Sequence, residues 1–153
     1  MPHRQRKSPR KPGYDYAQPG MYFVTICTHA RAHLFGAVVN DAMQPSALGE
    51  IAQAAWAQVS AYWAGAVDVD NFVVMPNHTH AIVLLNGGVT LGQVVNGYKS
   101  NVTRHIRQIV PGMQVWQRQY HDHIIRNETA LNHIRQYVQT NPQRWQADTF
   151  YDE

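Results

Sequence analysis

The segment Met75-Pro76-Asn77-His78-Thr79-His80 runs directly into the apolar stretch 81–85, Ala-Ile-Val-Leu-Leu, which predicts a buried β-strand. Side chains alternate between the two faces of a strand, so His78 and His80 lie on one face and Thr79 points to the other. Two neighbouring imidazoles are typical of a metal site, because imidazole nitrogen is the commonest metal ligand in proteins. The chain has 9 His, however, so the spacing alone leaves a chance pair equally open.

The segments around this strand predict one α+β domain. β-branched and aromatic residues predict strands at 22–28 and 67–75, a short hairpin is expected at 37–43, and residues 115–126 are expected to form an irregular strand or loop. Helical patterns occupy the intervals between them. The order of elements therefore indicates helices packed on an antiparallel sheet, with no internal repeat and no domain boundary.

Three helices are predicted from capping residues and apolar stripes. The expected N-caps are Ser46, Thr90, which has Gln93 at the capping-box position, and Asn127. Gly65 is expected to end the first helix and Pro142 to close the last. The residues expected to face the core are Leu48, Ile51, Ala55, Val59 and Tyr62 in the first helix, Leu91, Val94, Val95, Tyr98, Val102 and Ile106 in the second, and Leu131, Ile134 and Val138 in the third.

Composition narrows the class of protein. A chain of 153 residues fits one domain, and 44% hydrophobic against 15% charged residues excludes a disordered chain. The single cysteine, Cys27, has no internal partner for a disulfide, which favours a reducing cytoplasm. No apolar run approaches the ~18 residues that a membrane span needs, and no apolar segment follows the basic N-terminus as a signal peptide would require. We therefore expect a cytoplasmic protein.

Basic residues are concentrated in an N-terminal arm, residues 1–12, which we expect to be flexible. The arm holds 5 of the 13 basic residues and no acidic one, and the rest of the chain carries 8 basic against 10 acidic residues. Such an arm gains affinity for nucleic acid by counterion release, although a merely solubilising tail stays open. The residues expected to bind DNA are Arg4, Arg6, Lys7, Arg10 and Lys11 in the arm and Lys99, Arg104, Arg107 and Arg118 further along.

The last predicted helix carries a second cluster of polar residues. His133, Tyr137 and Asn141 recur every four residues and so share one helix face. A tyrosine there is a candidate nucleophile, but its phenol has a pKa near ~10, so attack at neutral pH needs a nearby metal or base. From the residues alone, a half-buried packing role for Tyr137 is the stronger interpretation.

Several longer motifs carry a resemblance to a known family. FVVMPNHTH with its apolar strand, YKSNVTRHI, VWQRQYHDHIIRNE and IRQYVQTNPQRW follow YDYAQPGMYFVTICT and LFG in this order. The chain thereby resembles the REP-associated tyrosine transposases, relatives of the single-tyrosine HUH transposases of small bacterial insertion sequences. The match runs from about residue 13 to 145. It implies a single domain over residues 13–153, with a ferredoxin-like fold and the histidine (HUH) strand in the sheet centre.

The resemblance assigns roles to residues already singled out. His78, His80 and Asn141 correspond to the metal ligands and Tyr137 to the nucleophile. Two positions depart from the family pattern: Thr79 replaces a bulky apolar residue, so weaker packing is expected there, and Tyr98 stands where phenylalanine is common, which makes it a rival nucleophile.

The family implies a bacterial enzyme that nicks single-stranded or hairpin DNA, such as repetitive extragenic DNA, and transfers the strand through a 5′-phosphotyrosine. Mg²⁺ or Mn²⁺ is the expected cofactor, with no organic cofactor and no membrane partner. The protein is expected to be a monomer, or a homodimer that exchanges helices. We also expect Trp116 or Tyr120 to stack on bases.

Two other interpretations stay open at this stage. One is a hydrolase with two metal ions, held by His78 and His80 together with the second H-x-H pair, His121 and His123. The other is a domesticated relative that binds DNA without cutting it.

Overall fold

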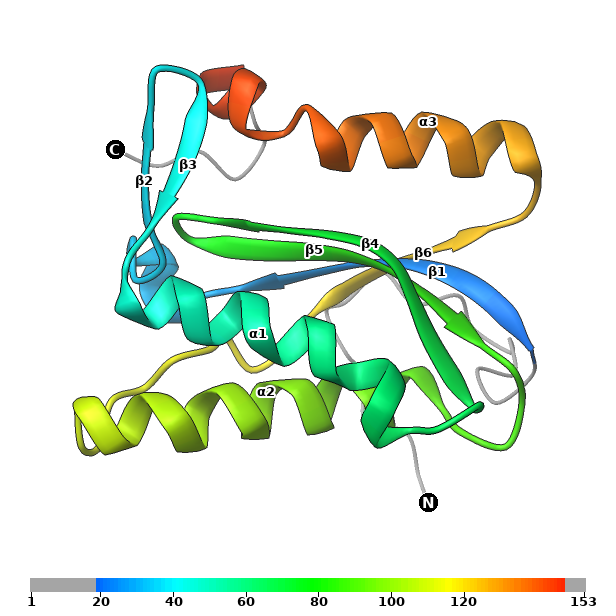
Figure 1. The fold of residues 1–153 in the computed structure, drawn as a ribbon, viewed down its shortest axis with the longest axis horizontal. Coiled ribbons are helices and arrows are strands. Elements are labelled where there is room, and N and C mark those ends of the chain that lie inside the picture. The colour runs from blue at the N-terminus through cyan, green and yellow to red at the C-terminus, as the bar shows by residue number, and fades with distance from the viewer. Residues whose placement is uncertain (1–18, 148–153) are drawn as a thin grey trace.

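The computed structural model describes residues 19–147, so the basic arm with Arg4, Arg6, Lys7, Arg10 and Lys11 lies outside the described residues. Figure 1 shows the arrangement of the elements. The strands are β1 (Gly20–Cys27), β2 (Gly36–Val39), β3 (Ala42–Pro45), β4 (Val67–Met75), β5 (His78–Leu85) and β6 (His121–Ile125). The helices are α1 (Ala47–Tyr62), α2 (Leu91–Ile109) and α3 (Glu128–Gln139), and the 3-10 turns are η1 (His29–Arg31) and η2 (Pro142–Ala147).

The main sheet has the order β4-β5-β1-β6, and all three of its pairings are antiparallel. Its strands and the first two helices follow one another as β1-α1-β4-β5-α2-β6, which is the β-α-β-β-α-β order of a ferredoxin-like domain. The hairpin β2–β3 is an insertion between β1 and α1. The histidine strand β5 is an inner strand, so the predicted α+β fold with a central histidine strand is confirmed.

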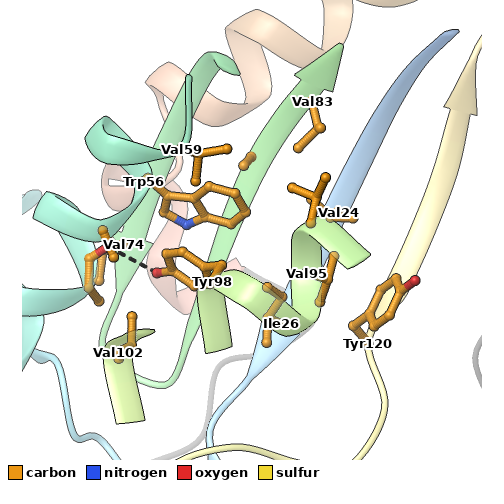
Figure 2. Packing of buried hydrophobic residues seen from close by; sticks show 14 of the residues in the cluster. Val24, Ile26, Trp56, Val59, Val74, Val83, Val95, Tyr98, Val102 and Tyr120 are labelled. Atoms are coloured by element: carbon orange, nitrogen blue, oxygen red, sulfur yellow. Dashed lines mark hydrogen bonds between the residues drawn. The ribbon is translucent and has the colours of Figure 1, made fainter. Parts of the chain in front are cut away.

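The larger core lies between the sheet and helices α1 and α2, which cover the same face (Figure 1). In this core the ring of Trp56 from α1 stacks on Tyr98 from α2, with 3.9 Å between ring centroids (Figure 2). Thr79 points into the same core, as its alternation with the histidines predicted, and it is fully buried. Its hydroxyl accepts a hydrogen bond of 2.8 Å from Trp56 Nε1 and donates one of 3.1 Å to the Val73 carbonyl. A buried indole N–H needs a hydrogen-bond acceptor. The threonine hydroxyl is that acceptor here, and an apolar residue at this position would have none.

The predicted helix starts are confirmed. Ser46 accepts a hydrogen bond from Gly49 N, Asn127 accepts one from Ala130 N, and Thr90 forms the complete capping box with Gln93. The predicted stripe of α2 is entirely buried. No helix within residues 19–147 is long and apolar enough to cross a membrane.

One prediction about local structure is wrong. Tyr62 was expected in the core but is 78% exposed, because it is the last residue of α1 and its ring packs against the adjacent Trp63, with 5.1 Å between centroids. The expectation of an irregular strand or loop over 115–126 is confirmed, since only His121–Ile125 forms a regular strand there. The preceding segment is attached to the end of β1 by an isolated bridge between Thr28 and Trp116.

Helix α3 covers the opposite face of the sheet, alone among the three helices (Figure 1). It packs through a small cluster formed by Ile82, Ile125, Leu131 and Val138. An ion pair adds to this contact: Arg135 of α3 donates two hydrogen bonds, of 2.7 and 2.8 Å, to the carboxylate of Asp70. Asp70 lies where the register of β4 shifts between Val69 and Asn71. The helix that carries Tyr137 is therefore attached at both its apolar face and its edge.

Removing the ion pair is expected to have a small, pH-dependent effect on stability. The hydrogen bonds from Arg135 lower the pKa of Asp70, so the pair stabilises the fold above the ordinary carboxyl value of 3.8 and this contribution is lost as the pH falls through the lowered value. Because the pair is exposed, we expect Asp70→Asn to lower the Tm at pH 7 by no more than about 3 °C. Thermal unfolding followed by circular dichroism measures this difference.

Asp68→Asn is the matched control, since Asp68 is an exposed carboxylate on the same strand. A Tm difference between wild type and Asp70→Asn that persisted unchanged into strong acid would contradict the ion-pair contribution.

Candidate active site

His78 and His80 lie side by side on the sheet face that α3 covers. They are 0% and 1% exposed, and their ring centroids are 4.7 Å apart. Each ring is oriented by a hydrogen bond at Nδ1: His78 Nδ1 lies 2.8 Å from Asn77 Oδ1, and His80 Nδ1 lies 2.9 Å from Thr25 Oγ1. Thr25 is the direct cross-strand neighbour of His80 on β1.

The hydrogen bond to Asn77 determines which ring nitrogen of His78 suits a metal. An amide oxygen only accepts hydrogen bonds, so Nδ1 of His78 carries the proton and the lone pair of the neutral ring is at Nε2. Metal-binding histidines in proteins typically have this arrangement, in which an outer partner holds one nitrogen and thereby orients the other. Sequence reasoning missed both partners. The role of Thr25 depends on strand pairing, whereas Asn77 stands directly before His78, a position that could have signalled its role.

Helix α3 brings Tyr137 to the histidine pair within a single chain. The half-buried Tyr137 ring lies 5.6 Å from the His80 ring and 6.0 Å, edge to face, from Phe23. Phe23 in turn stacks on His80 with 4.9 Å between centroids. Two segments separated by 57 residues, from position 80 to 137, thus form one cluster of rings.

The chain beyond α3 completes the surroundings of His78. Trp145 of η2 stacks on the His78 ring, with 6.1 Å between centroids, and is 9% exposed. Asn141 lies between Tyr137 and Trp145 in the chain and is fully buried, including its amide oxygen. Tyr137 and Trp145, four residues to either side of Asn141, contact His80 and His78 respectively, so Asn141 is a candidate member of the same cluster. His133, on the predicted polar face of α3, is exposed.

The donor atoms in this cluster fit a divalent cation. Two imidazole nitrogens and an amide oxygen form a mixed set that Mn²⁺ accepts readily and Mg²⁺ accepts through its oxygen ligand. Within residues 19–147 no group of three His, Cys, Asp or Glu side chains is placed to hold a metal. An ion held here would therefore depend on Asn141 and on oxygens from water or substrate.

Tyr98 is not placed to act as a nucleophile. It is 2% exposed in the core on the other side of the sheet, and its hydroxyl donates a hydrogen bond of 3.0 Å to the Ala52 carbonyl (Figure 2). Burial raises the pKa of its phenol far above the ordinary value of 10. Of the two tyrosines considered from the sequence, only Tyr137 lies beside the histidines.

The second histidine pair lies on the same sheet face but on the edge strand β6. His121 and His123 are exposed and pair with Thr25 and Phe23 of β1. The whole of strand β1 therefore separates them from His78 and His80, a spacing of roughly 9–10 Å between backbones. Within residues 19–147 these four histidines supply no group of three that is placed to hold a metal, so the arrangement disfavours the hydrolase interpretation.

The four basic residues predicted to bind DNA within the described residues line one groove. It has a volume of ≈ 800 Å³ and lies between α2 and the segment 114–118, with Lys99, Arg104, Arg107, Arg118 and Trp116 among its walls. Lys99 Nζ donates to the Gln117 carbonyl at 2.9 Å and Arg107 Nε to the Met113 carbonyl at 3.0 Å, so both also attach residues 113–117 to α2. Arg104 and Arg118 are exposed. Tyr120, expected to stack on bases, is instead 3% exposed in the core.

Fold and site together define a ferredoxin-like domain. It has a histidine pair on an inner strand, and the helix that carries Tyr137 packs over the same face of the sheet. A family model described as "Transposase IS200 like" matches residues 20–141. The chain belongs to this family of transposases.

Three known proteins are similar to this chain. A Haemophilus influenzae protein described as uncharacterized is 33% identical over 168 residues, covering 95% of this chain and 93% of its own length. The structure of a REP-associated tyrosine transposase bound to a REP hairpin is similar, with a TM-score of 0.61, 19% identity, and coverage of 87% of this chain and 72% of that one. A putative transposase from Deinococcus radiodurans aligns with a TM-score of 0.51 and 19% identity, over 85% of this chain and 96% of that one. At this identity the two structures support the fold.

Proposed function

We propose that this transposase nicks one strand of DNA and transfers it to another 3′-OH, with Tyr137 as the nucleophile and a divalent cation held by His78, His80 and Asn141. The observation that carries the proposal is the 5.6 Å separation of the Tyr137 and His80 rings in one chain. The packing role that sequence reasoning favoured for Tyr137 does not by itself account for a neighbouring buried pair of histidines oriented through Nδ1.

The reaction exchanges one phosphoester for another. The Tyr137 oxygen attacks phosphorus after its proton passes to solvent, the bond between phosphorus and the 3′-oxygen breaks, and that oxygen takes up a proton. The products are a 5′-phosphotyrosine and a free 3′-OH, and attack by another 3′-OH reverses the step without ATP. Bound Mg²⁺ or Mn²⁺ would neutralise charge on the phosphate and favour the phenolate. The protein's part is to hold the tyrosine and to orient both imidazoles.

Single-stranded or hairpin DNA is the proposed substrate. A single nucleophile cuts one strand, and the structurally similar REP-associated tyrosine transposase is bound to a REP hairpin. The groove beside α2 supports DNA binding because cationic and polar side chains line it, including Ser100, Thr103 and Gln114. It lies on the side of the sheet opposite α3, so DNA bound there would extend around the domain to reach Tyr137.

The exposed arginines of the groove are expected to contribute phosphate contacts. We expect Arg104→Gln and Arg118→Gln each to reduce the slope of log Kd against log salt by about 1, because each neutralised phosphate releases condensed counterions. Fluorescence anisotropy with a labelled hairpin oligonucleotide at several salt concentrations measures the slope.

Arg126→Gln is the control, since Arg126 is exposed but lies outside the groove. An unchanged slope in both groove variants would remove the groove from the interface. Charge reversal of the arm, at Arg4, Arg6, Lys7, Arg10 and Lys11, tests that segment in the same way.

Covalent capture tests the proposed reaction. Wild-type protein is incubated with a 3′-labelled hairpin oligonucleotide and Mn²⁺ or Mg²⁺, and the denatured products are separated by gel electrophoresis. We expect a labelled protein–DNA adduct that requires the metal and disappears in His78→Ala. Tight binding of the oligonucleotide with no adduct under any metal would instead indicate a domesticated DNA-binding protein.

A further inference from the structure

Arg144 contacts Tyr137 in two different ways. Its guanidinium carbon lies 4.4 Å from the centroid of the Tyr137 ring, in a cation–π arrangement. Its Nη2 also donates a hydrogen bond of 2.9 Å to the Tyr137 carbonyl oxygen. Arg144 is an exposed residue in η2, seven positions further along the chain.

Thr140 fixes the guanidinium in this place. Its hydroxyl accepts hydrogen bonds from Arg144 Nη2 at 3.0 Å and from Nε at 3.2 Å. The same hydroxyl donates its proton to the Gln136 carbonyl at 2.8 Å, so its lone pairs are the part available to Arg144. The arrangement requires a planar group with several donors in fixed directions, which arginine has and lysine lacks.

These contacts restrict the Tyr137 side chain. The guanidinium lies over the ring, while Phe23 and the His80 ring contact it at steep angles of 90° and 68°. The positive charge also sits at the C-terminus of α3, where the exposed carbonyls favour a cation. A half-buried ring would otherwise sample several orientations, and nucleophilic attack depends steeply on orientation.

We infer that Arg144 is a positioning residue for Tyr137: it holds the ring and the last turn of α3 in the orientation from which the phenol oxygen attacks. The inference rests on the proposed function of Tyr137 as the nucleophile. Arg144 in this role affects the rate of the chemical step and has no effect on DNA affinity.

The test compares Arg144→Lys and Arg144→Gln with wild type, and Arg126→Gln is the control for loss of one exposed positive charge near α3. Adduct formation is followed under single-turnover conditions at saturating oligonucleotide, and Kd is measured by anisotropy. We expect both Arg144 variants to form the adduct about 10- to 100-fold more slowly, with Kd within about twofold of wild type. Arg126→Gln should react at the wild-type rate.

A second measurement does not depend on cleavage. Ring resonances of isotope-labelled tyrosine, assigned to Tyr137 by their absence in Tyr137→Phe, should shift in both Arg144 variants and not in Arg126→Gln. A normal rate at saturation with a weakened Kd would overturn the inference, since Arg144 would then bind DNA directly. Unchanged Tyr137 resonances would overturn it too. If wild-type protein formed no adduct but the resonances shifted, the proposed function would fail while the positioning contact stood.

Discussion

Replacing Tyr137 by phenylalanine is expected to eliminate the covalent protein–DNA adduct completely while leaving folding and DNA binding unchanged. The substitution removes only the hydroxyl, because the ring that contacts His80, Phe23 and Arg144 is retained. Loss of one hydroxyl with a hydrogen bond it makes costs about 0.5–1.5 kcal/mol of stability, which a folded domain tolerates. Without a nucleophilic oxygen no phosphotyrosine forms, so the loss is a loss of chemistry and not of structure. Gel analysis with a 3′-labelled oligonucleotide measures the adduct, and anisotropy measures Kd.

Two matched variants make this result specific. Tyr98→Phe removes the hydroxyl that donates to the Ala52 carbonyl in the core, and Tyr62→Phe alters a side chain that is 78% exposed. Both are expected to form the adduct at the wild-type level. Adduct that persisted in Tyr137→Phe and was lost in Tyr98→Phe would sink the assignment of the nucleophile.

The elements that the sequence predicted correctly are those determined by local periodicity. Alternation within 78–80 placed the two histidines on one face and Thr79 on the other, and the stripe of α2 is buried in full. Helix caps were also predicted correctly, because a capping side chain accepts a hydrogen bond from a backbone N–H no more than three residues away. Tyr62 shows the limit of a periodic pattern: the period continues to the end of α1, but burial there depends on what the helix packs against.

The parts of the site that the sequence could not predict depend on tertiary contacts. Thr25 reaches His80 only because β1 and β5 pair in one register, and a slip of one residue would turn its side chain to the other face. Trp145 reaches His78 only because the chain turns back after α3. Neither residue lies at a spacing from the histidine motif that a local pattern could detect.

The histidine strand connects the fold to the site through its two faces. Thr79 is held by Trp56 of α1, on the side of the large core, and the histidines on either side of it face α3. The rigidity of the core therefore fixes the backbone from which both imidazoles project. By contrast, α3 rests on a small cluster, an exposed ion pair and the contacts of Arg144, so the Tyr137 half of the site is the less constrained half.

Loss of one imidazole is expected to weaken metal binding strongly. We expect His80→Leu to weaken the affinity for Mn²⁺ by more than about 100-fold, since removal of an outer hydrogen-bond partner alone typically weakens it 10- to 100-fold. Leucine fills the buried site without donating a lone pair, which limits the cavity that alanine would leave. Thr25→Val, which removes only the hydrogen bond to His80 Nδ1, should give an intermediate loss. Isothermal titration with Mn²⁺ measures both affinities, and circular dichroism verifies the fold.

The second histidine pair provides the control for this prediction. His123→Leu alters an exposed imidazole on the same sheet face, beyond strand β1, and should leave one Mn²⁺ bound per chain with wild-type affinity. Two ions per wild-type chain, one of them lost in His123→Leu, would revive the two-metal hydrolase. Wild-type affinity in His80→Leu would show that the ion binds elsewhere. The loss of Mn²⁺ affinity should therefore be largest in His80→Leu, intermediate in Thr25→Val and absent in His123→Leu. A site that includes His80 and is oriented by its cross-strand neighbour requires this order.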